Sequence, residues 1–160
     1  MKTRTTRKNV QNISKKQKDV HVLAQGTFDL LHPGHLHYLN AAKKFGTHLS
    51  VIVARDSTSA RIKNRKTIFS EQMRLQMVRA LKVVDRAVLG GKGNILDKVL
   101  QIDPDVIVLG YDQSISEKKL AKDLHSRGWV GKIVRAKAFI PKKYKSTKLK
   151  NTIVKNHTPK

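Results

Sequence analysis

The sequence predicts an α/β fold, a single domain in which a five-stranded parallel sheet carries helices on both faces. Apolar runs of strand length alternate with segments of helical spacing, as in successive β-α-β units. Several of these runs are apolar throughout, which is typical of parallel strands covered on both faces. At 160 residues, the chain is long enough for one such domain and too short for two ordinary ones.

Five segments have the length and composition of buried strands, and the segments between them have helical spacing. The strands are expected over 20–26, 47–54, 83–90, 105–110 and 132–139. Helices are expected over 34–46, after Ser70, after Asn94, over 117–127 and over 146–154.

Two further expectations concern the part of the chain between the second and third strands. The segment 55–69 is polar and basic without periodicity, so we expect it to be irregular. In the helix after Ser70, Met73 and Met77 have the spacing of core residues.

Basic residues outnumber acidic ones 34 to 11, a formal net charge of +23 that is concentrated at the two ends. Residues 1–18 contain seven Lys or Arg and no acid, and residues 142–160 also contain seven and no acid. We therefore expect a disordered basic tail over 1–18, a domain over 19–154 and a basic end over 155–160. Residues 19–141, between the two basic ends, also carry an excess of positive charge, which favours anionic ligands such as nucleotides.

The composition excludes several kinds of site. The chain has no cysteine, which excludes disulfides, thiolate metal sites and cysteine nucleophiles. Its apolar runs are far shorter than the roughly 20 residues of a membrane span. The basic N-terminus has no apolar signal core. A cytoplasmic protein that does not enter the membrane is expected.

The motif GTFDLLHPGH, residues 26–35, lies where the first strand passes into the first helix. In an open parallel sheet, ligands bind at this edge. Pro33 suits a first helical turn, where unpaired N–H groups favour an anion, and Gly34 lets the backbone approach a phosphate. His32 and His35 are three residues apart and can face the same way. Both can therefore donate to phosphate oxygens on which charge develops during nucleotidyl transfer.

The same residues resemble a known signature. Thr27, His32, Gly34 and His35 match the Thr/Ser and H-x-G-H signature of the nucleotidylyltransferase superfamily. With VIVARDST, EQMRLQMVRALKVVDRAVLG and PDVIVLGYDQ, the chain is most similar to the cytidylyltransferase-like branch, and within it to archaeal-type FAD synthetases. The similarity covers about residues 20–147 and implies a Rossmann-like domain.

The resemblance implies transfer of the adenylyl group of ATP to the phosphate of FMN, with a divalent cation assisting, to give FAD and pyrophosphate. It assigns His32 and His35 to catalysis, and Asp112 in GYDQ to contact with the nucleoside, with Tyr111 and Gln113 as further candidates for that pocket. The residues that it assigns to the triphosphate are Thr27, Phe28, His32, Pro33, Gly34 and His35.

The resemblance also implies a second group of phosphate contacts. Ser146 and Thr147, followed by Lys148, resemble a late motif that closes over the β- and γ-phosphates, although a helix cap alone explains them almost as well. Asp29 is a candidate to orient metal-bound phosphates, and no residue is assigned as a direct metal ligand. The candidates for the substrate phosphates are Lys63, Arg65, Lys66 and Arg135.

Two local alternatives stay open. His32, His35 and His37 could form a metal site, although no cysteine or carboxylate cluster accompanies them, and His37 is expected to be a surface residue. The GGKGN segment, 90–94, lacks the spacing of a phosphate-binding P-loop, so we expect a strand-to-helix turn that borders the pocket.

Two other functions also stay open. The same residues serve a cytidylyltransferase that uses CTP with glycerol-3-phosphate, phosphocholine or phosphoethanolamine. The basic ends would suit a nucleic-acid-binding protein, a reading that the 5% aromatic content does not favour. The expected partners are ATP and FMN as substrates, together with a second copy of the chain in a homodimer.

Overall fold

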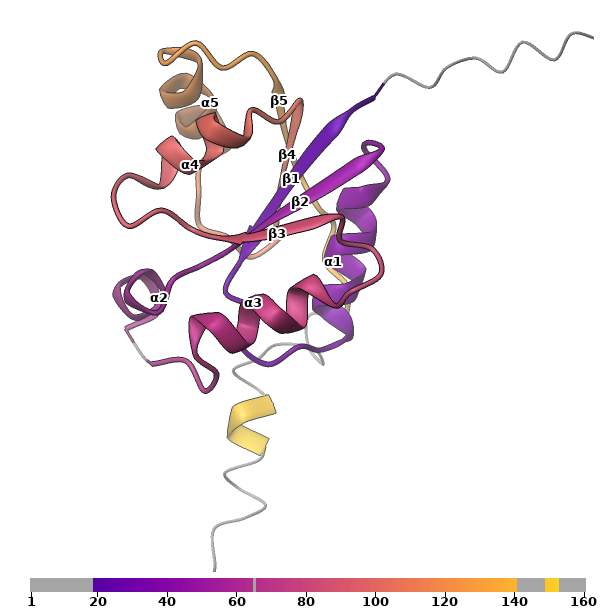
Figure 1. Cartoon of the computed structure of the whole chain (residues 1–160), viewed down its shortest axis with the longest axis vertical. Coiled ribbons are helices and arrows are strands. Elements are labelled where there is room, and N and C mark those ends of the chain that lie inside the picture. The colour runs from indigo at the N-terminus through magenta and orange to yellow at the C-terminus, as the bar shows by residue number, and fades with distance from the viewer. Residues whose placement is uncertain (1–18, 65, 141–148, 153–160) are drawn as a thin grey trace, which may run out of the picture.

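The described part of the chain, residues 19–64, 66–140 and 149–152 of a computed structural model, is built on one parallel sheet (Figure 1). The strand order is β3-β2-β1-β4-β5. This sheet confirms the predicted Rossmann-like fold. The strands are β1 (His21–Gly26), β2 (His48–Val53), β3 (Arg86–Leu89), β4 (Val106–Leu109) and β5 (Lys132–Arg135).

Helices cover both faces of this sheet (Figure 1). Leu39 of α1 and Val78 of α3 pack in a core with Val22 of β1. Val99 of α4 and Leu124 of α5 pack in a second core with the adjacent Leu23, on the other face. The helices are α1 (Pro33–Lys43), α2 (Asp56–Lys63), α3 (Glu71–Arg79), α4 (Ile95–Ile102) and α5 (Glu117–His125). The chain thus winds from β1 to β3 over one face and from β3 to β5 over the other.

The reversal of strand order falls between β1 and β4, which pair through Val22–Val106, Leu23–Ile107 and Ala24–Val108. After these pairs the two strands diverge, and the loops that follow them turn in opposite directions. Such a switch point opens a crevice outside the carboxyl ends of the strands, which is where ligands bind in open α/β sheets.

Two predicted helix starts are confirmed. The Ser70 hydroxyl accepts from the N–H of Met73 at 3.4 Å, and the Asn94 side chain accepts from the N–H of Leu96 at 2.9 Å. Each bond satisfies an N–H that has no partner inside its own helix. The predicted last helix lies partly outside the described residues, of which 149–152 are helical.

The expectation of an irregular segment over 55–69 is wrong, because α2 occupies Asp56–Lys63. This helix buries Ser59 against Thr27, just after β1, while Ser57, Arg61 and Ile62 are exposed. Its N-terminus is held from outside, since the Glu71 carboxylate accepts from the N–H of Asp56 at 2.9 Å. Tertiary hydrogen bonds, not an apolar stripe, stabilise α2, so hydrophobic periodicity gave no signal of it.

The core face of α3 also differs from the expected one. Met73 is 48% exposed and Met77 is half-buried, while Arg74, Leu75 and Val78 are buried. The helix is rotated because the Arg74 guanidinium, and not a methionine, fills the space under the loop after β1.

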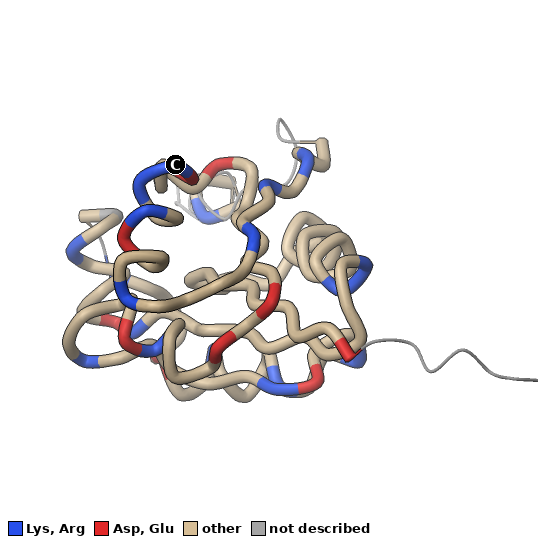
Figure 2. The backbone as a smooth tube through the Cα atoms, turned by 90° about the horizontal axis from the view of Figure 1, so that it is seen from above, with Lys and Arg blue, Asp and Glu red and all other residues tan. Residues whose placement is uncertain are grey.

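Along the described backbone, Lys and Arg positions are interspersed with Asp and Glu positions (Figure 2). The tail over 1–18 and the end over 155–160 lie outside the described residues. Within the described ranges, no helix has the length and apolar character needed to cross a bilayer.

Candidate active site

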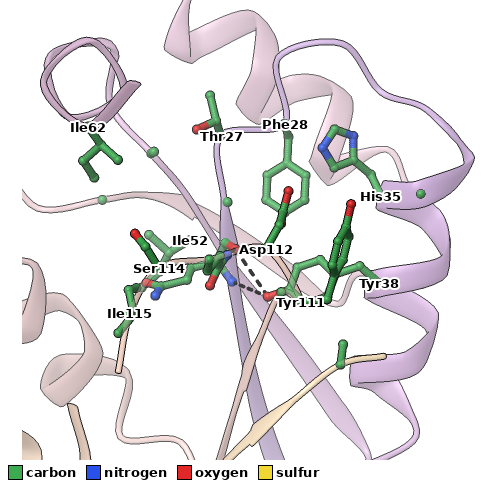
Figure 3. Close-up of a pocket in the computed structure, with 18 of the residues that line it drawn as sticks. Thr27, Phe28, His35, Tyr38, Ile52, Ile62, Tyr111, Asp112, Ser114 and Ile115 are labelled. Atoms are coloured by element: carbon green, nitrogen blue, oxygen red, sulfur yellow. Dashed lines mark hydrogen bonds between the residues drawn. The ribbon is translucent and has the colours of Figure 1, made fainter. Parts of the chain in front are cut away.

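A pocket of about 560 Å³ lies at the carboxyl ends of the strands (Figure 3). Its lining includes residues from the segments that follow all five strands, with Thr27 after β1, Ala54 after β2, Gly90 after β3, Asp112 after β4 and Lys137 after β5. The pocket therefore occupies the ligand-binding position of a doubly wound sheet.

Two imidazoles stand together at the start of α1. His32 caps the helix, since its Nδ1 accepts from the N–H of Gly34 at 3.1 Å. The ring of His35, in the first turn, stacks on that of His32 with 3.9 Å between centroids and 23° between planes. Both side chains line the pocket. The positive end of the α1 dipole and two potential N–H donors thus meet at one place, which is an arrangement suited to an anion.

The cap fixes the protonation state of His32. Because Nδ1 accepts a hydrogen bond, the ring proton of the neutral imidazole must be on Nε2. Burial lowers the pKa of His32 below its ordinary value, and the nearby charge of Asp112 opposes this only in part. His32 is therefore neutral at pH 7 and keeps one N–H donor for a ligand.

Phe28 packs against the ring of His35. It is buried, and its backbone has a φ of 52°, a left-handed conformation that costs of order 1–3 kcal/mol for a non-glycine residue. Gly26 permits this turn, because a Cβ there would lie 2.9 Å from the Phe28 ring. The ring centroid lies 5.2 Å from that of His35 (Figure 3). Packing thus holds the loop in a strained form that positions His35.

A buried arginine that was not predicted from the sequence braces the same loop. Arg74 is fully buried and donates to the Thr27 carbonyl at 2.5 Å, to the Phe69 carbonyl at 3.1 Å and to the Asp56 carboxylate at 2.7 Å. It joins the end of β1 to α2 and α3. A signal was present, since Arg74 occupies a core-facing position four residues before Val78.

Asp29 serves this loop as well. Its buried carboxylate accepts from the N–H of Ile68 at 2.8 Å and of Phe69 at 3.1 Å, and it pairs with Lys150. Burial opposes ionisation, but the hydrogen bonds from Lys150, Phe69 and Ile68 outweigh it and lower the pKa of Asp29. Asp29 is not among the described residues that line the pocket. In this structure its carboxylate connects three segments of the chain.

Tyr38 closes the floor of the pocket where β1 and β4 diverge. Its hydroxyl donates to the Val108 carbonyl at 2.7 Å and accepts from the N–H of Gln25 at 3.2 Å. The Gln113 amide adds a bond from Nε2 to the Gln25 carbonyl at 2.7 Å. Burial raises the pKa of Tyr38, which stays a neutral structural group. Tyr38 was not predicted, although it lies three residues after His35 on the same helix.

The loop that carries Asp112 is held by Arg135. The Arg135 guanidinium donates to the carbonyls of Gly110, Gln113 and Ile115 at 2.8, 2.8 and 2.7 Å, and to the Glu117 carboxylate at 2.8 Å. It is not one of the described residues of the pocket lining, in contrast to the expected contact with a substrate phosphate. The exposed Asp112 side chain lines the pocket, on a backbone that Arg135 fixes.

The structure brings together most of the predicted triphosphate and nucleoside residues. The pocket lining includes Thr27, Phe28, His32, Gly34, His35, Tyr111, Asp112 and Gln113. Pro33 begins α1 and is exposed, and Lys66 is exposed outside the described lining. Arg65, Ser146, Thr147 and Lys148, like the side chain of Lys63, lie outside the described part of the chain.

His37 corrects a further expectation. It is half-buried instead of a surface residue, and its ring stacks on that of Phe139 with 4.4 Å between centroids and 12° between planes. It lines the pocket on the side of β5. No group of three or more His, Cys, Asp or Glu in the described ranges could hold a metal ion by itself.

The fold and this site define the class: a nucleotide-binding α/β domain with an anion site at the switch point of its sheet. A family model described as cytidylyltransferase-like matches residues 23–152. The chain belongs to this family and is a nucleotidylyltransferase.

Two curated relatives and one solved structure are similar to this chain over most of its length. A FAD synthase of Methanohalophilus mahii is 50% identical over 115 residues, which cover 71% of this chain and 79% of that protein. A FAD synthase of Archaeoglobus profundus is 46% identical over 137 residues, 84% of this chain and 86% of the relative. A solved structure from Thermoplasma volcanium, titled a lipopolysaccharide core biosynthesis protein, superposes with a TM-score of 0.72 at 47% identity, over 75% of this chain and 98% of that one.

Proposed function

We propose that this chain makes FAD by transferring the adenylyl group of ATP to FMN. An oxygen of the FMN phosphate attacks the α-phosphorus of ATP and forms the new P–O–P bond. The bond from the α-phosphorus to the bridging oxygen breaks, and pyrophosphate leaves with that oxygen. The observation that carries the proposal is the stacked His32–His35 pair at the N-terminus of α1. The choice of FMN and ATP is supported by relatives named FAD synthase at 46–52% identity.

Because the FMN phosphate is itself the nucleophile, the protein has to stabilise negative charge and does not have to supply a nucleophilic side chain. Charge increases on the α-phosphate oxygens and on the departing pyrophosphate in the transition state. The ring N–H groups of His32 and His35, which lie at the positive end of the α1 dipole, are the donors offered to these oxygens. Because the cap and the stacking fix both rings before the reaction, little reorganisation opposes catalysis.

The nucleoside is assigned to the loop after β4. The Asp112 carboxylate is an acceptor that suits ribose hydroxyls, and Arg135 holds its backbone in place. Tyr111 and Gln113 line the same side of the pocket. The side-chain oxygen of Gln113 is buried without a hydrogen-bond donor among the described residues.

A divalent cation fits this site when it enters with the triphosphate. Asp112 is the only acidic side chain in the described pocket lining, and Mg²⁺ typically combines one or two carboxylates with substrate phosphates and water. The cation would neutralise phosphate charge when bound. Asp112 is the residue best placed to help hold it, while Asp29 is occupied by the protein.

The late Ser146–Thr147 pair remains part of the proposal for the β- and γ-phosphates, with Lys63, Arg65 and Lys66 as basic candidates near them. Support comes from residues 149–152, which follow the pair. Lys150 pairs with Asp29 and so ties this segment to the loop after β1. A contact between the pair and the triphosphate requires that proximity.

The test is direct conversion. Purified protein with FMN, ATP and Mg²⁺ should yield FAD and pyrophosphate in equal amounts, and EDTA should stop the reaction. Parallel reactions replace ATP by CTP and FMN by glycerol-3-phosphate. Nucleotidyl transfer to glycerol-3-phosphate but not to FMN would replace the proposal by the cytidylyltransferase alternative.

A further inference from the structure

One side of the pocket is apolar in a way that phosphate chemistry does not explain. Four isoleucines line it: Ile52 from β2, Ile62 from α2, Ile95 from the start of α4, and Ile115 from the loop before α5. Figure 3 shows Ile52, Ile62 and Ile115 on the opposite side of the pocket from His35. They come from four separate parts of the chain and share only this cavity.

Three of these side chains are exposed where burial would be favourable. The exposed fractions are 64% for Ile62, 37% for Ile95 and 38% for Ile115. Single exposed isoleucines are common on protein surfaces, but several that converge on one cavity mark a place where apolar surface is covered by a ligand. The occupant must be apolar on its faces and large enough to reach α2 and α4 together.

The strand order sets where this occupant lies relative to the reacting phosphates. The histidines follow β1, the central strand, and Asp112 follows β4 on one side. Ile52, Ile62 and Ile95 belong to β2, to the helix after β2 and to the helix after β3, on the other side. Ile115 belongs to the loop after β4, but its side chain lies on the same side of the pocket as Ile52 and Ile62 (Figure 3). A reaction that joins two nucleotides through their phosphates needs two such flanks, with the phosphates in the centre.

We infer that Ile52, Ile62, Ile95 and Ile115 form the subsite for the isoalloxazine ring of FMN. This inference rests on the proposed function, and it adds which part of the chain selects the acceptor. The tricyclic ring is flat and largely apolar on both faces, so branched side chains can pack against it. A small acceptor such as glycerol-3-phosphate would leave these isoleucines exposed and gain none of that burial.

The test uses Ile62→Ser and Ile95→Ser in the full chain, with Ile68→Ser as the matched control. Ile68 is 56% exposed and is not among the described residues of the pocket lining. FMN binding is measured by flavin fluorescence, and KM is measured separately for FMN and ATP. We expect each pocket variant to weaken FMN binding and raise its KM about tenfold or more, because apolar contacts in a pocket have effects of this size. The KM of ATP and the melting temperature should stay close to those of the Ile68→Ser control.

Riboflavin separates the ring from the phosphate. It should compete with FMN in the unmodified protein, and that inhibition should weaken in both pocket variants. If the unmodified protein forms FAD while both variants keep its KM for FMN, the subsite is wrong and the proposed function stands. If the variants raise the KM of ATP instead, the isoleucines hold the adenosine, and the inference is overturned. If the unmodified protein neither binds FMN nor forms FAD, the proposed function itself fails.

Discussion

His32 combines two tasks in one side chain. Its Nδ1 caps α1 through Gly34, and the same bond leaves the ring proton on Nε2 for a ligand. Protonation of Nδ1 would break the cap and place a cation at the positive end of the helix dipole. Burial prevents this at neutral pH by lowering the pKa of His32. The structural and chemical roles of the residue therefore require the same neutral tautomer.

This coupling predicts a pH dependence of stability. In the unfolded chain His32 takes up a proton near its ordinary pKa of 6.5, whereas in the folded protein it does so only at lower pH. At lower pH the unfolded state then binds more protons than the folded state. The contribution of His32 to the free energy of unfolding is therefore fully present above pH 6.5 and is lost as the pH decreases below 6.5. Urea unfolding between about pH 7.5 and about pH 5.5 measures the slope.

His32→Asn is the control for that slope, because asparagine caps helices without titrating. It should make the slope shallower but not zero, since burial also lowers the pKa of His21. An unchanged slope in His32→Asn would show that His32 does not titrate as the cap requires.

At the scale of elements, two of the loops at the carboxyl edge are held by arginines in addition to apolar packing. Arg135 fixes the loop between β4 and α5, and Arg74 fixes the loop between β1 and α1. A guanidinium with several fixed donors can hold several carbonyls at once, which fixes the backbone of a loop. The pocket can then stay open while its walls remain rigid.

Replacing Arg135 with methionine tests whether this residue holds the loop between β4 and α5. Loss of the bonds to Gly110, Gln113 and Ile115 should let the Asp112 loop move and raise the KM of ATP about tenfold, with a smaller change in kcat. Steady-state kinetics measure both constants. Arg127→Met, which removes an exposed ion pair with Asp97, should leave them unchanged. Equal effects of the two substitutions would contradict the positioning role.

Replacing Arg74 with methionine tests whether this residue holds the loop between β1 and α1. The Thr27 and Phe69 carbonyls would lose their buried donor, so we expect the free energy of unfolding to fall by about 3 kcal/mol. Arg61→Met on the exposed side of α2 is the matched control and should change stability by less than about 0.5 kcal/mol. Chemical denaturation of both variants gives the comparison, and a similar small change in each would remove Arg74 as a brace.

For the whole molecule, the five-stranded parallel sheet with helices on both faces and the pocket at its carboxyl edge followed from the sequence, because strands and helices give short-range signals. The strand order was not predicted. Ser70 and Asn94 mark helix starts through their own side chains, and the apolar run 106–109 can only be a buried strand. Tertiary contacts decided the rest. The segment Asp56–Lys63 becomes helical through Glu71, which local patterns do not encode. Arg74 takes the core position in place of Met73, although only its spacing from Val78 indicated this.

The basic tail, residues 1–18, is not expected to take part in the reaction. The described pocket lining falls within residues 25–139, so deletion of residues 2–18 should leave kcat and the melting temperature essentially unchanged. Kinetics are measured at physiological ionic strength, where long-range attraction of anionic substrates is largely screened. A large loss of kcat would instead assign the tail to the reaction itself.

The histidine pair is the centre of the proposed chemistry, and the rate of FAD formation by His35→Ala tests it most directly. With FMN and ATP saturating, kcat should fall by about 100- to 1,000-fold, the usual effect of losing a transition-state donor. The melting temperature should remain close to that of the unmodified protein, and His35→Gln, which keeps an N–H donor, should recover part of the rate. A folded His35→Ala protein with undiminished kcat would contradict the account.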